Sequence, residues 1–154
     1  MIKSDDTSIA VLNTLITVNT DAQAGYETAA TDVRDPELGR FFGEAAAQRM
    51  KFVDELTQRV RLMRGEPAKT GTLAGKIHRA VIDEKAASET AQAHAILAEC
   101  ERAEDVAVSA YRKALEARDV DVQTHTLIQS QYEQVQLGHD RVRDLRDSPA
   151  YAHR

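Results

Sequence analysis

Apolar residues recur every three or four positions along four long stretches of the chain, which is the period of an α-helix with one buried face. These stretches cover about residues 5–33, 36–64, 92–118 and 122–146. At 1.5 Å per residue, a helix of about 25 residues is about 38 Å long. A shorter amphipathic helix is predicted over about residues 73–85, between the second and third long helices.

Turn-forming residues separate these stretches. Asp35 and Pro36 end the first helix and begin the second, because Pro36 disfavours a helical residue before it and suits the first turn of a helix. Gly65 and Pro67 end the second helix, and residues 119–121 form a tight turn before the fourth. The residues after Pro149 are expected to be frayed.

Four helices with one apolar face each bury those faces best against one another, as a bundle. The first two helices and the last two are joined by short turns, so each pair is predicted to be an antiparallel hairpin. The long connection with its own short helix then returns the chain along the bundle and leaves the second and third helices parallel. The sequence therefore predicts an all-α, ferritin-like four-helix bundle, as a single domain over residues 1–154 with its core at about 8–147.

Composition and charge narrow the functional classes. Aromatic residues make up 5%, with 7 Gly and 3 Pro, which disfavours an all-β fold. The net charge of −5 lacks the basic surface of a nucleic-acid-binding protein. No stretch has the roughly 18 apolar residues of a membrane span, the first residues do not resemble a signal peptide, and the single Cys100 cannot form an internal disulfide. We therefore expect a cytoplasmic protein that binds neither nucleic acid nor membrane.

Several polar side chains fall within the apolar faces, at similar depths near the middle of the bundle. This expected buried polar network comprises Asn19, Gln23, Tyr26, Gln48, Arg49, Glu104 and His139. Arg49 and Glu104 lie on adjacent faces and are predicted to form a buried ion pair. Losing one partner of such a pair costs about 3–5 kcal/mol, because the other charge is then buried alone.

A metal centre is the competing interpretation of the same region. Di-iron bundles use a Glu from each of two helices and a Glu-x-x-His motif from each of the other two. The chain offers a partial set of ligands, namely Glu27, Glu101, Glu104 and His139. Gln136 stands where the motif ending at His139 needs Glu, and the cation of Arg49 disfavours a metal beside it. We therefore expect no cofactor, with iron held by these four residues as the alternative.

Other candidate residues carry weaker signals. Cys100 is expected to be a buried small hydrophobic residue, with a redox thiol as the alternative. Tyr26 and Tyr132 are expected to pack in the core with their hydroxyls in the polar network, with a redox-active tyrosine as the alternative. Four further histidines are expected to be solvated, namely His78, His94, His125 and His153. Catalytic triads, phosphate-binding glycine loops and CxxC pairs are absent from the sequence.

Five segments together resemble a family of small bacterial proteins, the ferritin-like four-helix-bundle domain of unknown function. The segments are residues 12–16 with 25–26, residues 35–38, residues 71–79, residues 94–105 and residues 139–143. The resemblance implies a ferritin-like bundle of the stress-associated type, with no established reaction. It supports the long connection between the second and third helices, and it does not supply the missing Glu-x-x-His ligands.

The expected function is therefore that of a non-enzymatic ferritin-like bundle with a vestigial or absent metal site, in a stress-related or protein-interaction role. A homo-oligomer, most simply a dimer, is expected because the segment 73–85 adds an amphipathic surface. The enzymatic alternative is a di-iron oxidase or iron-binding protein that uses the carboxylates and His139. A third possibility is a small-molecule binder, because small interior side chains can leave a cavity.

Overall fold

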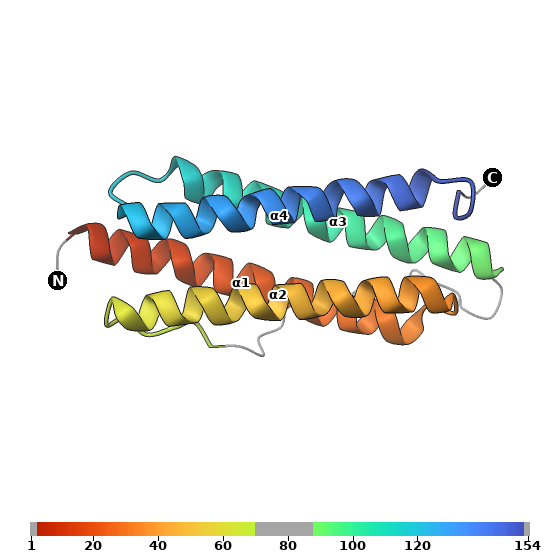
Figure 1. The fold of residues 1–154 in the computed structure, drawn as a ribbon, viewed down its shortest axis with the longest axis horizontal. Helices are drawn as coiled ribbons and strands as arrows, with labels where there is room; N and C mark the ends of the chain where they lie inside the picture. Colours follow the sequence, from red (N-terminus) through yellow and green to blue (C-terminus); the bar gives the residue numbers. More distant parts are fainter. Residues whose placement is uncertain (1–2, 70–87, 153–154) are drawn as a thin grey trace.

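The computed structural model describes residues 3–69 and 88–152 and consists of four long α-helices (Figure 1). They are α1 (Lys3–Asp32), α2 (Pro36–Leu62), α3 (Glu89–Glu116) and α4 (Val122–Asp147). No strand occurs in these two described ranges, which confirms the all-α fold class. None of these helices is both long and apolar enough to cross a membrane, over the residues that the structure describes.

The helices begin where side-chain oxygens can cap them. Asp35 caps α2 by accepting hydrogen bonds from the backbone N–H groups of Glu37 (2.9 Å) and Leu38 (3.2 Å), with Pro36 in the first turn as predicted. Ser88 caps α3, so α3 begins at Glu89, a few residues before the predicted start near 92. A break was expected between residues 88 and 91, and Ser88 turns that break into a helix start by accepting from the N–H of Ala91.

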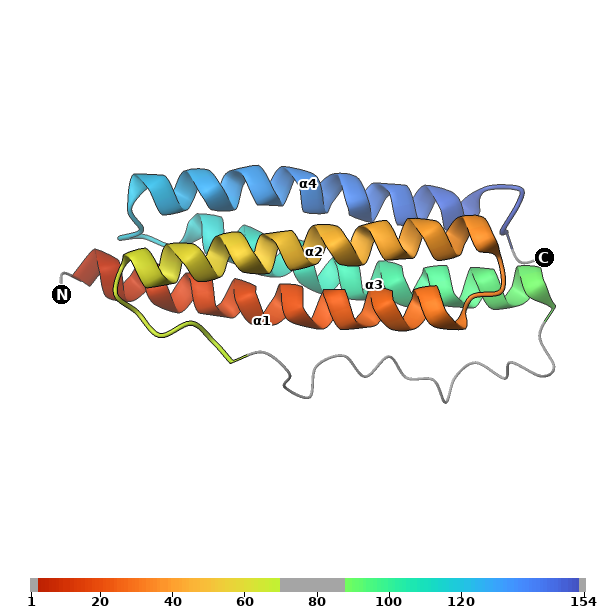
Figure 2. The same ribbon diagram turned by 60° about the horizontal axis from the view of Figure 1, so that its bottom comes forward.

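The four helices run alternately along the bundle except at one step. α1 and α2 form one antiparallel hairpin and α3 and α4 form another, while α2 and α3 run parallel (Figures 1 and 2). This confirms the ferritin-like connectivity with one long connection. The predicted short helix 73–85 lies outside the described residues.

The first residues of that connection lie against α1. The Asn13 side chain donates to the carbonyl of Glu66 (3.0 Å) and accepts from the N–H of Ala68 (2.7 Å). A Cβ at position 65 would lie 2.8 Å from the Ile9 side chain, so a larger residue would force Ile9 to shift where the chain turns back beside α1. α2 ends at Leu62, and the left-handed residue at its end is Arg64 (φ 62°) and not the predicted Gly65.

The core is divided into two apolar clusters. One gathers toward the N-terminal half of α1 and includes Leu12, Ile16, Phe52, Leu56, Ile128 and Val135. The other gathers toward the α1–α2 turn and includes Tyr26, Phe42, Ala46, Leu97, Cys100 and Val142. Along each helix a short gap separates the two clusters, and polar residues occupy most of these gaps.

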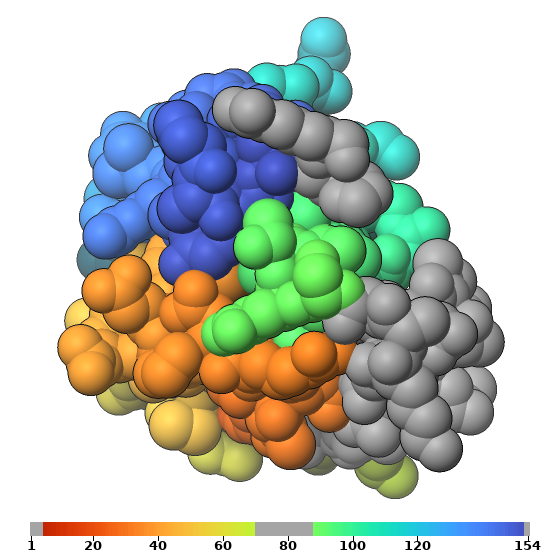
Figure 3. Space-filling model, turned by 90° about the vertical axis from the view of Figure 1, so that its right-hand side faces the viewer, coloured from red at the N-terminus to blue at the C-terminus, as the bar shows by residue number. Residues whose placement is uncertain are grey.

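The chain end is packed onto the second cluster. Tyr151 is buried, its hydroxyl donates to Asp35 Oδ2 (2.9 Å), and its carbonyl contacts His94 Nδ1 (3.1 Å). Figure 3 views this end, where the α1–α2 turn, the start of α3 and the end of α4 meet. The expected fraying was wrong for residues 150–152, because Tyr151 anchors them to the bundle, and the expectation of a solvated His94 was wrong because this side chain is half-buried against the Tyr151 carbonyl.

Candidate functional site

A buried ion pair lies at the centre of the bundle. Arg49 on α2 donates from Nη2 to Oε1 of Glu104 on α3, and each side chain is 1% exposed. Asn19 on α1 accepts from Arg49 Nη1 at 3.3 Å. Burial raises the pKa of the Glu104 carboxyl, and the neighbouring charge of Arg49 opposes that shift. The pair is therefore almost fully buried, and each charge depends on the other.

Hydrogen bonds extend this pair into a chain that touches all four helices. Asn19 Nδ2 donates to the Tyr111 hydroxyl (2.8 Å), which donates to Gln131 Oε1 (2.7 Å). Gln131 Nε2 in turn donates to Glu55 Oε1 on α2 (3.0 Å). Burial is the main cause that raises the pKa of Tyr111 to about 12, so its hydroxyl stays protonated and available as a donor. In this series of hydrogen bonds each side chain donates to the next, from Arg49 at one end to Glu55 at the other.

Tyr111 and Gln131 were not predicted as network members. Both lie on the apolar faces of their helices, so their positions were readable from the helical period. However, the pattern predicts only that Tyr111 is an aromatic residue of the core. The structure is needed to show that its hydroxyl bonds to Asn19 and Gln131.

Of the other predicted members of the network, Tyr26 lies beside the ion pair, while Gln23 and His139 point away from it. Gln23 donates to Glu27 Oε1 (3.0 Å) on the exposed side of α1, and His139 bonds outside the core on the α3–α4 face. Tyr26 is buried, and its hydroxyl lies by the Glu104 carboxylate as a hydrogen-bonding partner, whereas Gln48 is half-buried. Residues at the edge of a helix's buried arc, such as Gln23, turn outward because their side chains reach water at little cost.

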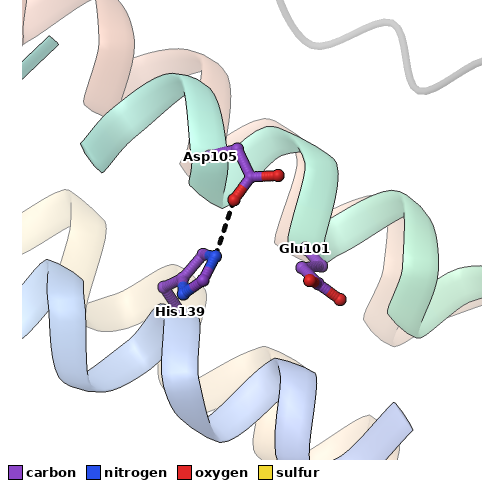
Figure 4. A group of neighbouring side chains, drawn as sticks. All are labelled: Glu101, Asp105 and His139. Carbon is purple, nitrogen blue, oxygen red and sulfur yellow. Dashed lines mark hydrogen bonds and ion pairs between the residues drawn. The ribbon is translucent and has the colours of Figure 1, made fainter. Parts of the chain in front are cut away.

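A second group of candidate residues lies between α3 and α4. Glu101 and Asp105 are one turn apart on α3, and His139 reaches them from α4 (Figure 4). One ligand atom from each lies within 4.8 Å of the other two, and His139 Nε2 is 2.6 Å from Asp105 Oδ1. Asp105 was not a predicted member, although its spacing of four from Glu101 places both on one helix face.

The other two predicted metal ligands do not join this group. Glu104 is held in the buried pair with Arg49, and Glu27 is exposed on α1. The interior around Glu104 offers an amide, phenols and a guanidinium in place of further carboxylates and imidazoles. That donor set does not fit a di-iron centre, because iron needs negative oxygen ligands and neutral nitrogen ligands.

The electrostatics of the outer group favour a proton on His139. Burial lowers the pKa of His139, but its hydrogen bonds and ion pairs with Asp140 and Asp105 outweigh burial, so the net shift is upward. Glu101 also pairs with Arg146. A metal ion would have to displace both the imidazole proton and this arginine, since only neutral imidazole is a ligand.

The remaining candidates have structural roles. Cys100 is buried, and burial together with the charges of Glu104 and Glu99 raises the pKa of its thiol, which opposes the thiolate needed for redox chemistry. The Tyr132 hydroxyl accepts from Arg112 Nε (3.0 Å) at the surface. The expectation that this hydroxyl joins the core network was therefore wrong. His125 is exposed, as expected, and His78 and His153 lie outside the described residues.

Comparison with solved structures supports the fold. A mutant of Dps1 from Mycobacterium smegmatis is similar to this chain with a TM-score of 0.75 and 15% sequence identity, over 94% of this chain and 98% of that one. At this identity the likeness shows a shared ferritin-like bundle fold.

The sequence comparisons place the chain in a family. No curated protein matches the sequence. Residues 7–117 match a domain of unknown function, and this range contains Asn19, Arg49, Glu104 and Tyr111, whereas all of α4 lies beyond it. The match spans well over half of the chain, which therefore belongs to the family described as the domain of unknown function DUF2383.

Proposed function

We propose that this protein is a non-enzymatic ferritin-like bundle in which the Arg49–Glu104 pair replaces an interior metal centre. The observation that carries the proposal is the guanidinium of Arg49, 1% exposed, between the two apolar clusters. A fixed positive charge opposes a metal cation at the same place, and Asn19 and Tyr111 supply neutral groups around it. In this role the bundle is a stable protein-interaction module of the cytoplasm, of the stress-related type.

We also propose that the module acts as a homodimer. The amphipathic pattern of residues 73–85 supports this, as do exposed apolar side chains such as Val106 on α3 and Leu137 on α4. Light scattering coupled to size exclusion tests the proposal. A mass near twice the 17.0 kDa of one chain is expected, and a mass of 17.0 kDa across the concentration range contradicts it.

An anaerobic Fe(II) titration followed by exposure to air tests the absence of a di-iron centre. We expect no stoichiometric binding and no ferric absorbance band. Two equivalents of tightly bound iron that oxidise on contact with air would overturn the proposal. The same titration of the Arg49→Gln variant is the matched control, because it removes the cation and keeps a hydrogen-bond donor at that position.

A second candidate function is a single-ion site between α3 and α4, favoured by the proximity of Glu101, Asp105 and His139. One imidazole and two carboxylates suit a divalent transition metal such as Zn²⁺ or Fe²⁺. Calorimetric titration with Zn²⁺ at about pH 7.5 tests it, because binding must release the His139 proton. Binding that vanishes in His139→Ala supports this site, and binding that the substitution leaves unchanged rejects it.

A further inference from the structure

The polar centre of the bundle lacks a side chain from one helix. Asn19, Arg49 and Glu104 fill the gaps between the two apolar clusters on α1, α2 and α3, and the corresponding gap on α4 falls at Gly138. A Cβ at this position would lie 3.1 Å from Glu104 Oε2 and 4.0 Å from Arg49 Nη2. Gly138 therefore leaves the α4 side of the ion pair without a covering side chain.

A cavity of about 290 Å³ opens beside Gly138, between α2 and α4. Its inner wall is formed by Tyr26, Arg49 and Glu104, and its lining includes apolar side chains of α2 and α4, notably Phe41 and Leu137. All four helices contribute to it. This combination of apolar walls with a few convergent polar groups is typical of small-molecule sites.

Two polar atoms of the inner wall lack hydrogen-bond partners. Within the described part of the chain, Glu104 Oε2 and Arg49 Nε are both buried and unpaired. A ligand that fills the cavity displaces water from Glu104 Oε2. A ligand that donates a hydrogen bond to this oxygen therefore gains more than one that only fills space and leaves the acceptor buried and unpaired. The acceptor belongs to a side chain that is 1% exposed and is held in place by Arg49 on its other oxygen.

The charges around the cavity cancel. Glu44 and Glu104 each carry one negative charge, and Arg49 and Arg141 each carry one positive charge. Net charge in the lining therefore favours neither anions nor cations. The volume is roughly twice the ~150 Å³ cavity that holds a benzene ring.

From these observations we propose that the cavity binds a small uncharged molecule with a ring-sized apolar body and a hydroxyl group that donates to Glu104 Oε2. Phenols and compact alcohols are the chemical class that fits. The apolar body lies against Phe41 and Leu137, and the hydroxyl reaches the carboxylate over Gly138. This site does not depend on the outcome of the iron titration, because it needs only the ion pair and the glycine.

The proposal is tested by titrating the ¹⁵N-labelled protein with p-cresol and following the amide resonances. Saturable shifts are expected at Gly138 and at neighbouring residues of the lining. The control ligand is 4-methylanisole, which has the same ring and methyl group but no hydroxyl donor. It is expected to bind at least about tenfold more weakly, because Glu104 Oε2 stays unpaired in that complex.

Two glycine variants locate the site. Gly138→Ala places a methyl group against Glu104 Oε2 and is expected to weaken p-cresol binding at least about tenfold. Gly43→Ala is the matched control, because a Cβ there meets nothing within 4 Å, and it is expected to bind p-cresol as the wild type does. Circular dichroism establishes that both variants are folded.

Three results would overturn the proposal. They are the absence of saturable shifts up to the solubility limit of p-cresol, equal binding of 4-methylanisole, and unchanged binding in a folded Gly138→Ala variant. If Gly138→Ala does not fold, the comparison of the two ligands on the wild-type protein still decides between a donor-specific site and simple apolar filling.

Discussion

Arg49 and Glu104 face each other from the parallel helices α2 and α3, and each is 1% exposed. One carboxylate oxygen accepts from the guanidinium, while the other has no partner among the described residues. A buried pair of this kind adds little net stability, because removing both charges from water offsets their attraction. Its main consequence is the penalty that appears when one partner is lost.

The first prediction concerns that penalty. Arg49→Leu and Glu104→Gln are each expected to lower the free energy of unfolding by about 3–5 kcal/mol, because each leaves its former partner buried alone. The double variant Arg49→Leu/Glu104→Leu is expected to be more stable than either single variant, since it buries no charge at this position. Urea denaturation of the three variants measures the coupling between the two residues.

An exposed ion pair provides the control for these three variants. Arg143 is 43% exposed and pairs with Asp144 at 3.2 Å, so Arg143→Leu is expected to cost less than about 1 kcal/mol. If Arg49→Leu and Glu104→Gln also cost so little, neither substitution leaves a buried, unpaired charge, and the buried ion pair is contradicted.

The second prediction concerns the Tyr111 hydroxyl, which accepts from Asn19 and donates to Gln131. Tyr111→Phe leaves Gln131 Oε1 without its donor and one N–H of Asn19 without its acceptor, both in the buried interior. The loss in unfolding free energy is expected to be about 1–3 kcal/mol, the desolvation penalty of a stranded polar group. Thermal or urea denaturation measures it.

Tyr132→Phe is the matched control. The Tyr132 hydroxyl accepts from Arg112, an exposed residue, so water can replace that bond. A change within about 0.5 kcal/mol is expected. Equal effects of the two substitutions would show that the buried chain of hydrogen bonds has no special weight.

The helical period was sufficient to predict the four helices and the depth of Asn19, Arg49 and Glu104, and the lengths of the connections between the helices predicted their connectivity. These features depend on residue spacing along a rigid helix, which the sequence states directly. The partners of His139 could not be predicted in the same way. Its place at the edge of the buried arc allows either an inward or an outward direction, and the reach of Asp105 from the neighbouring helix decides it.

The importance of Gly138 was equally hidden in the sequence. In the sequence, a glycine beside the apolar face of a helix indicates only a small residue. Its role in leaving space becomes clear only when the atoms opposite it are known. Glu104 Oε2 supplies that information, because it lies where a side chain at position 138 would begin. The unpaired state of that oxygen depends on the directions of several side chains, which spacing alone does not determine.

The third prediction concerns the accessibility of Cys100. The side chain is buried, and burial followed by the charges of Glu104 and Glu99 raises the pKa of the thiol. Because the thiolate is the reactive form, we expect very slow reaction of the native protein with a disulfide reagent at about pH 8. The single cysteine is expected to react fully and rapidly in urea. Rapid stoichiometric labelling of the native protein would contradict burial.

The last prediction is a pH dependence of stability that arises from His139. Burial lowers its pKa, but the bonds to Asp140 and Asp105 prevail and raise it above the ordinary 6.5. A raised folded-state pKa means that the protonated form is stabilised by folding. This contribution is fully present below the unfolded-state pKa and is lost as the pH rises through the folded-state pKa. When the His139 ring resonances are followed by NMR as the pH is raised, they are expected to give a pKa above 6.5.

Two variants separate this effect from the other titrating groups. His139→Gln is expected to make the unfolding free energy less dependent on pH between about pH 6 and pH 8, where histidine is the main titrating side chain, because it removes the contribution of His139 and leaves those of the other four histidines. Asp105→Asn keeps the size of its side chain but removes a negative charge 2.6 Å from Nε2, so it is expected to lower the pKa of His139. A pKa that is unchanged in Asp105→Asn would mean that the α3–α4 contact does not persist in solution. The same measurement therefore tests the geometry on which any metal site between Glu101, Asp105 and His139 depends.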